Sequence, residues 1–337
     1  MTNSTWADEA LKQRFLSEAP VAWKELRDAE VSYQGTMSYT LTDLKTKRVH
    51  EQTTREFKRT GSWALWIERK DIERRPAGVK QQSSQKRGAS AYGTNSEYAF
   101  QLAQMPGRGG DAVWILERLE FHDSPSEAAR ELADYARRGA RGPLTGGQVL
   151  DPNYLYEMIE DPTFSVEDAR IVNQEGQELV ELTIYHKSEA SDAVTEGTVW
   201  LDPAKYWLIH EAKLQVNSPS QGIVWTSSVQ KKYDNDLTEF PLAAESSVVK
   251  EIKSPGPRAV EDARKMGFPE PPTLELVYRY DLKPLEDPDE EDFMLTAFGL
   301  PEPADTSSGG FGPLWLWILI GGLLLATVGF LIRRRAA

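Results

Sequence analysis

The chain contains no cysteine in its 337 residues. This excludes disulfide bonds, thiol catalysis and thiolate metal sites. Histidine is also scarce, because His50, His122, His186 and His210 are the only four and lie at least 24 positions apart. His186 and His210 fall on predicted strands that could be neighbours, so a two-histidine site is conceivable. Ordinary strand histidines are the simpler interpretation.

Recognisable catalytic motifs are missing as well. The sequence has no nucleophile elbow and no metal-ligand spacing, and the glycines of residues 107–110 lack the Lys-Ser/Thr that follows a phosphate-binding loop. Those glycines indicate a hairpin turn. We therefore predict no catalytic residues, no cofactor and no metal, and an unrecognised enzyme is the third of the functions considered below.

Positive charge is in deficit over most of the chain. All 52 acidic residues precede residue 313 and only three of the 39 basic residues follow it, so residues 1–312 carry a net charge of −16. Such a domain repels nucleic acid. Residues 45–87 are a local exception with a net +8, whereas residues 286–305 hold eight acids and no base. The two regions are interpreted as solvated surfaces; alternatively, the basic loop Ile72–Arg87 binds an acidic protein partner or the chain's own acidic segment.

One long segment contains no charge. Phe311–Ile332 is an uncharged run of 22 residues, which as a helix spans roughly 33 Å, close to the thickness of a bilayer core. We therefore predict a transmembrane helix over residues 313–332, followed by a basic tail over residues 333–337, with the lipid bilayer as a partner. The residues expected to anchor this helix are Trp315, Trp317, Arg333, Arg334 and Arg335.

The charges on either side of this segment predict its orientation. Arginine follows it but no basic residue precedes it closely, so the positive-inside rule places the tail in the cytoplasm and the soluble domain outside. The protein would then be a single-pass protein of a bacterial-type inner membrane with a periplasmic or extracytoplasmic domain. Met1–Leu16 has neither the basic nor the apolar region of a signal peptide. Either a leader lies upstream of this start or the protein is tail-anchored with a cytoplasmic domain, and we favour the first. Pro301–Pro303 before the helix is also similar to a C-terminal sorting signal.

Residues 1–285 predict an α+β fold that is mainly antiparallel β. Residues 1–29 form an amphipathic helix that Pro20 kinks or splits, a second helix lies near residues 124–138, and a short one lies near Tyr154–Glu160. Between them, apolar and polar residues alternate, which is typical of half-buried strands. The strands are expected at Val31–Leu41, Arg48–Thr60, Ser62–Lys70, Tyr92–Gln104, Ala112–Phe121, Ala169–Asn173, Leu179–His186, Gly197–Leu201, Leu208–Asn217, Ile223–Tyr233, Ser246–Ile252 and Leu274–Leu282.

These elements predict one large curved half-barrel sheet, capped by helices, over residues 30–285. Residues 286–312, which are acidic and contain Pro, Gly and Ser, are expected to form a tether to the transmembrane helix. No sharp domain boundary is visible, and the loop at Ala140–Gln148 best divides two β-rich halves.

Two stretches carry a resemblance to a known superfamily. An amphipathic helix runs into the strand at Val31–Tyr39, and the strand Gly197–Leu201 ends in a Trp-Leu-Asp-Pro turn that leads to Ile209. In these features the chain resembles the superfamily of periplasmic lipoprotein carriers, outer-membrane lipoprotein receptors and sigma-regulator sensors. That resemblance implies an incomplete β-barrel closed by helices. A tethered domain cannot shuttle, so the resemblance favours sensing of an apolar ligand or a protein over lipoprotein transport.

Together these features predict a membrane-tethered, non-enzymatic binding or sensing domain for a lipid, an acyl chain or a partner segment. If the half-barrel is open, tryptophans on its strands line the cleft and contact the ligand, and we select Trp66, Trp114 and Trp207. The alternative is a membrane-anchored interaction scaffold in which these tryptophans fill a closed core.

Overall fold

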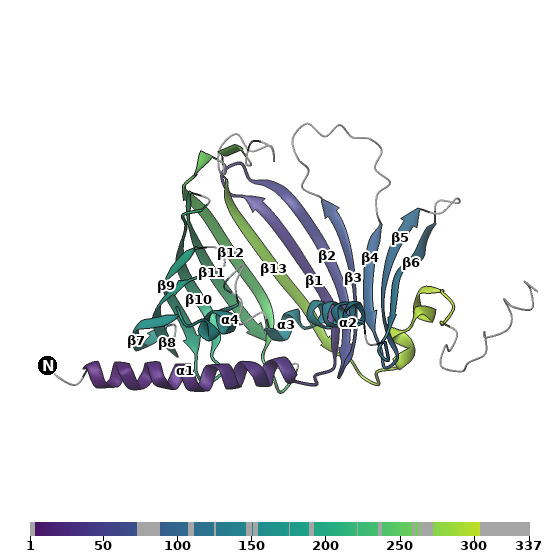
Figure 1. Cartoon of the computed structure of the whole chain (residues 1–337), viewed down its shortest axis with the longest axis horizontal. Helices are drawn as coiled ribbons and strands as arrows, with labels where there is room; N and C mark the ends of the chain where they lie inside the picture. Colours follow the sequence, from purple (N-terminus) through teal and green to yellow (C-terminus); the bar gives the residue numbers. More distant parts are fainter. Residues whose placement is uncertain are drawn as a thin grey trace, which may run out of the picture.

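The computed structural model describes residues 4–72, 88–106, 111–124, 126–145, 150, 154–174, 176–188, 192–220, 222–234, 238–257, 260–261, 264 and 272–303 (Figure 1). The helices are α1 (Ser4–Asp28), α2 (Glu127–Ala140), α3 (Gly142–Thr145) and α4 (Leu155–Glu160), with short 3₁₀ helices η2 (Glu290–Phe293) and η3 (Leu295–Phe298). The strands are β1 (Tyr33–Asp43), β2 (Arg48–Thr60), β3 (Trp63–Ile72), β4 (Ala89–Thr94), β5 (Tyr98–Pro106), β6 (Ala112–Phe121), β7 (Ser165–Gln174), β8 (Gln177–Lys187), β9 (Val194–Asp202), β10 (Leu208–Ser218), β11 (Ile223–Asp234), β12 (Leu242–Ser254) and β13 (Thr273–Pro284).

These strands form a single open, curved sheet in the order β6-β5-β4-β3-β2-β1-β13-β12-β11-β10-β9-β8-β7. Every neighbouring pair is antiparallel, and all but one are consecutive in the chain. The exception is β1 with β13, which pair from Tyr33↔Pro284 to Asp43↔Leu274 and join the two β-rich halves into one surface. The prediction of a mainly antiparallel fold with one large curved sheet and few helices is therefore confirmed.

The alternation of side chains placed most strands correctly, because burial on one face imposes a period of two. The predicted bounds of β2 and β6 coincide with the observed ones. The predicted strand Tyr92–Gln104 was wrong, since it is two strands joined by a tight turn. There the Asn95 carboxamide oxygen accepts hydrogen bonds from the backbone N–H groups of Glu97 and Tyr98, both at 2.9 Å, as in an Asx turn.

The helices cover one face of the sheet, called here the helix face (Figure 1). Helix α1 runs without interruption through Pro20, so the helix is not split there. Phe15, Ala19, Trp23 and Leu26 on this helix are fully buried against α4 and strands β7–β12. This burial stabilises the helix more than an interior proline destabilises it.

The other face of β3–β6, called here the opposite face, is covered by the C-terminal end of the described chain. On β3, Ala64 and Trp66 pack towards α2 and α3, whereas Leu65 between them packs against Phe293 and Leu295. Successive residues of a strand point to opposite faces, so η2 and η3 lie across the sheet from the helices.

Residues 286–303 belong to the segment 286–312 that was expected to form the tether, and part of them packs against the sheet. Phe293 and Leu295 are buried, and Lys58 on β2 forms an ion pair with Asp292 at 3.0 Å. This pair links the basic region 45–87 to the chain's own acidic segment.

The remaining predictions about the C-terminus lie outside the described residues. They concern residues 304–312 of the tether, the transmembrane helix 313–332 and its anchoring Trp and Arg residues; most of the basic loop Ile72–Arg87 also lies outside. Within the described part of the chain, no helix combines the length and apolar character needed to cross a membrane.

Candidate ligand-binding site

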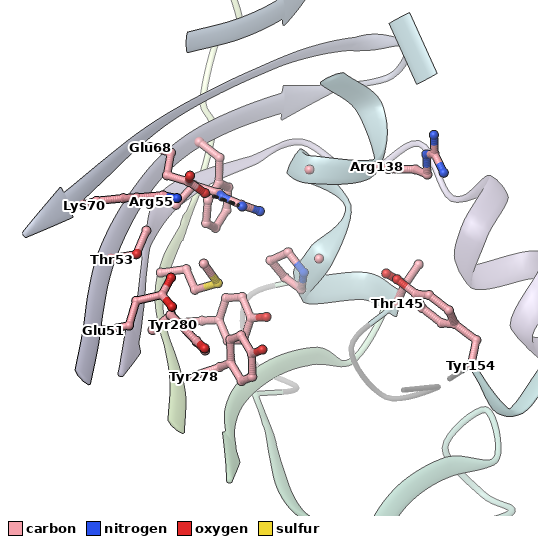
Figure 2. A pocket seen from close by; sticks show the side chains of 16 residues that line it. Glu51, Thr53, Arg55, Glu68, Lys70, Arg138, Thr145, Tyr154, Tyr278 and Tyr280 are labelled. Carbon is pink, nitrogen blue, oxygen red and sulfur yellow. Dashed lines mark hydrogen bonds and ion pairs between the residues drawn. The ribbon is translucent and has the colours of Figure 1, made fainter. Parts of the chain in front are cut away.

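A cavity of about 470 Å³ opens between the helix face and the segment that joins α2 to α3. Figure 2 shows its walls, with the side chains of β1, β2, β3 and β13 on one side and those of Arg138, Thr145 and Tyr154 across from them. The lining residues are Met37, Tyr39, Glu51, Thr53, Arg55, Phe57, Glu68, Lys70, Arg138, Gly139, Gly142, Pro143, Thr145, Tyr154, Tyr278 and Tyr280.

Strand register brings the sheet side of this lining together. On β2, the alternate residues 51, 53, 55 and 57 all point into the cavity. Tyr39 on β1 is the shared neighbour, since it pairs with Thr53 of β2 on one side and with Tyr278 of β13 on the other. The cavity therefore exists only because the first strand and the last strand are adjacent.

The centre of the cavity floor is aromatic. The rings of Tyr39 and Tyr278 lie with their centroids 5.0 Å apart, and Tyr280 and Met37 extend this surface. Burial raises the pKa of Tyr280 to about 12, with a smaller opposing effect from Arg55, so its hydroxyl stays protonated and can donate a hydrogen bond.

One wall of the cavity is charged. Arg55 forms an ion pair with Glu68 at 2.7 Å and lies 4.3 Å above the Trp66 ring. The Arg55 Nε atom and the Thr53 hydroxyl are both buried, and neither has a hydrogen-bond partner among the described residues. Lys70 and Arg138 are exposed at the margin of the cavity. An anionic group entering here would meet the cationic side chains of Lys70 and Arg138.

The far wall is held in place by α2 and α3. The Tyr33 hydroxyl donates to the Ala140 carbonyl at 2.7 Å, which fixes the end of α2 over the sheet. Gly139 allows this close approach, because a Cβ atom there would lie 2.1 Å from Nε1 of Trp66. At Gly142, by contrast, a Cβ would meet only the Tyr280 hydroxyl, at 3.8 Å.

The three tryptophans selected from the sequence lie in three different clusters. Trp66 is 2% exposed beneath the cavity and stacks on Tyr92 at 4.4 Å. Trp207, also 2% exposed, packs beside Phe15 in the core under α1. Trp114 is half-buried on the opposite face of β6. The structure does not bring them to one site, and ligand contact by each of them stays a prediction.

Tyr39, Thr53, Arg55 and Tyr278 were missed in the sequence. Alternation on β1 and β2 could have shown that each lies on one face of its strand. It could not have shown that β13 supplies further residues to the cavity wall, because the pairing of β1 with β13 joins residues more than 230 positions apart.

The histidines that suggested a two-histidine site are not neighbours. His186 lies on β8 and His210 on β10, with β9 between them. Each is near a carboxylate instead: His186 is 3.1 Å from Asp161, and His210 is 3.8 Å from Asp202. Over the described residues, no group of three or more His, Asp or Glu side chains is arranged to hold a metal ion.

Comparisons with known proteins give only distant structural likenesses. No family model matches the chain, and no curated protein matches it. Among solved structures, a LolA superfamily protein from Nitrosomonas europaea has a TM-score of 0.32 at 12% identity, covering 84% of this chain and 97% of its own.

Two further structures of the protein MucB are similar at lower scores. MucB in complex with MucA has a TM-score of 0.14 at 12% identity, covering 80% of this chain and 99% of its own. The Pseudomonas aeruginosa MucA/MucB complex has a TM-score of 0.14 at 13% identity, covering 77% of this chain and 98% of its own. Likenesses of this size support no argument about family or function.

Proposed function

We propose that this protein is a non-enzymatic binding or sensing domain that holds an amphiphilic ligand, such as an acyl chain with an anionic end, in the cavity on the helix face. The observation that carries the proposal is the lining itself. The cavity volume is that of an ordinary ligand site. It offers tyrosine rings and Met37 to an apolar segment and the exposed cationic side chains of Lys70 and Arg138 to a polar group.

The combination of apolar and charged residues in the lining favours some classes of ligand over others. A purely apolar ligand would cover the Arg55–Glu68 pair without providing it a hydrogen-bond partner, which costs free energy. An amphiphile with its anionic end near Arg55, Lys70 and Arg138 avoids this cost. A partner peptide with an acidic side chain has the same chemistry and is the second candidate. A scaffold with no ligand is the alternative from another class.

Tethering belongs to the same proposal. The uncharged run of residues 313–332 and the arginines after it support a single transmembrane helix, with the domain on the extracytoplasmic side. A domain held at a membrane surface would meet amphiphiles that leave the bilayer.

The test is to fill the cavity. Gly142→Phe adds a ring where a side chain has room, so we expect a dansyl-labelled fatty acid to bind the full-length protein saturably and the variant at least tenfold more weakly. Val21→Phe adds the same ring on the exposed surface of α1 and should leave binding unchanged. If the parent protein binds neither this probe nor an acidic peptide, the ligand proposal is wrong and the scaffold replaces it.

A further inference from the structure

The two edge strands of the sheet, β6 and β7, differ in how many apolar side chains they expose. Six large apolar side chains are exposed among the described residues, and three of them, Val113, Ile115 and Leu116, lie on the edge strand β6. Their exposed fractions are 50%, 48% and 40%. They belong to the uncharged run Ala112–Leu116, and no described strand pairs with the outer side of β6.

The other edge strand, β7, is protected. It carries Glu167, Asp168 and Arg170, and its pairing with β8 is irregular between Val166 and Asp168. Lys12 of α1 donates to the backbone carbonyl of Glu167 at 2.6 Å. Charged residues, bulges and covering elements are the usual means of preventing edge-to-edge association. Ala112–Leu116 of β6 carries no charge, and the irregularity in the pairing of β6 with β5 comes only after Leu116, at Glu117.

A lipid surface would not provide hydrogen-bond partners for the outer side of β6. The outer backbone groups of an edge strand need N–H and C=O partners, which hydrocarbon cannot supply. Glu117 on β6 would also be repelled by anionic headgroups, whereas Glu120 is paired with Arg118 at 3.1 Å. Another strand is the partner that offers both backbone hydrogen bonds and apolar contact.

We propose that β6 pairs antiparallel with β6 of a second copy of this chain, centred on Trp114. In that register Val113 lies opposite Ile115 of the second copy, and Ala112 lies opposite Leu116, so no charges meet within Ala112–Leu116. Asp111 lies opposite Glu117 at each end of this run. A register centred on Glu117 would instead place two carboxylates opposite each other at the centre of the pairing. The five-residue run is therefore self-complementary, as a two-fold symmetric interface requires.

The C-terminal end of the described chain favours this arrangement. Glu302 accepts a hydrogen bond from the Tyr98 hydroxyl of β5, so the chain leaves on the opposite face, one strand from the β6 edge. Antiparallel pairing of identical edges uses a two-fold axis perpendicular to the sheet. Both C-terminal ends then emerge on the same side, as two chains anchored in one membrane require.

If two β6 edges paired in parallel, the opposite faces of the two copies would point in opposite directions. The opposite face of one copy would then point away from the membrane. Residues 304–312 reach at most about 30 Å, which limits how far a tethered domain can reorient. This argument rests on the tether proposed above, whereas the self-complementarity of Ala112–Leu116 does not.

Single cysteine variants test the pairing in membranes that contain the full-length protein. Because the chain has no cysteine, any disulfide reports the introduced residues alone. Val113→Cys and Ile115→Cys, produced together, should form a disulfide-linked dimer under mild oxidation, since opposite Cβ atoms in such a pair are about 4.5–5.5 Å apart. Ile171→Cys on β7 is the matched control, because Ile171 is 58% exposed on the other edge. It should give at least tenfold less dimer.

A second variant, Ile115→Lys, should make the protein monomeric in lipid nanodiscs without changing its binding of the fatty-acid probe. A monomeric parent protein, equal cross-linking at Ile171, or a dimer that survives Ile115→Lys would overturn the proposal. Cross-linking of Ile115→Cys to a different protein would also overturn it, because the second copy would then be the wrong partner. Carbonate extraction of the same membranes reports separately whether the chain is tethered.

Discussion

Buried aromatic residues carry much of the packing in this domain, and Trp66 and Trp207 are the largest of them on the strands and turns. The Trp66 ring is enclosed by Arg55, Tyr92 and Gly139, and its Nε1 atom has no hydrogen-bond partner among the described residues. The ring lies beneath Arg55, which lines the cavity.

We expect Trp66→Ala and Trp207→Ala each to lower the free energy of unfolding by about 3–5 kcal/mol, because each leaves a large cavity in a packed region. Trp114→Ala, at a half-buried position, should cost less. Urea denaturation measures these differences. A direct role in ligand contact would appear instead as a loss of fatty-acid affinity greater than the loss of stability.

Titration at His210 should make stability depend on pH. Burial lowers the pKa of His210, although the nearby Asp202 carboxylate raises it in part. The unfolded chain, with a histidine pKa of about 6.5, then binds a proton that the folded protein does not. The free energy of unfolding should therefore fall as the pH drops below about 6.5, until the lower folded pKa is reached.

His210→Gln should remove this contribution and flatten the pH dependence of unfolding just below about pH 6.5. Chemical denaturation at several pH values compares the two proteins. An unchanged slope in the variant would show that another group is responsible.

At the scale of elements, the C-terminal segment behaves as part of the fold. The segment from η2 to η3 is attached to the β4–β5 turn, because Asn95 donates to the Phe293 carbonyl at 3.4 Å and the Ser96 backbone N–H donates to Glu290 at 3.2 Å. The Tyr98 hydroxyl accepts from the Leu295 backbone N–H at 3.2 Å. These contacts fix where the chain leaves the sheet.

Phe293→Ala is therefore expected to destabilise the domain by about 3–5 kcal/mol, since the ring is fully buried between η2 and β3. Thr296 lies three residues after Phe293 in the same segment but is exposed. Thr296→Ala should therefore change stability by less than about 0.5 kcal/mol. Thermal unfolding of both variants makes the comparison. Equal, negligible effects would mean that the segment from η2 to η3 does not contribute to the stability of the folded domain.

For the whole molecule, the predicted anchor should be separable from the folded domain. The described fold ends at Pro303, and the uncharged run begins eight residues later at Phe311. Deleting residues 313–337 removes this run and leaves every described contact in place.

We expect the truncated protein to be found in the soluble fraction, with an unfolding midpoint close to that of the full-length protein. Cell fractionation and circular dichroism measure the two properties. A truncated protein that still sediments with membranes would contradict the single-anchor prediction.

The sequence by itself determined the class of fold and most strand positions. The alternation in Arg48–Thr60 and Ala112–Phe121 was sufficient to place β2 and β6, because the period of two is a local property. It also identified the uncharged run of residues 313–332 from composition alone.

Only the tertiary structure decided which strands are neighbours and what lies between them. The pairing of β1 with β13 brings Tyr39 to Tyr278, and α2 and α3 close the cavity above them. Similarly, Phe293 and Leu295 became core residues because the sheet offers them an apolar face. Periodicity records which face of a strand is buried but not which distant segment buries it, so these contacts depend on the folded arrangement of the whole chain.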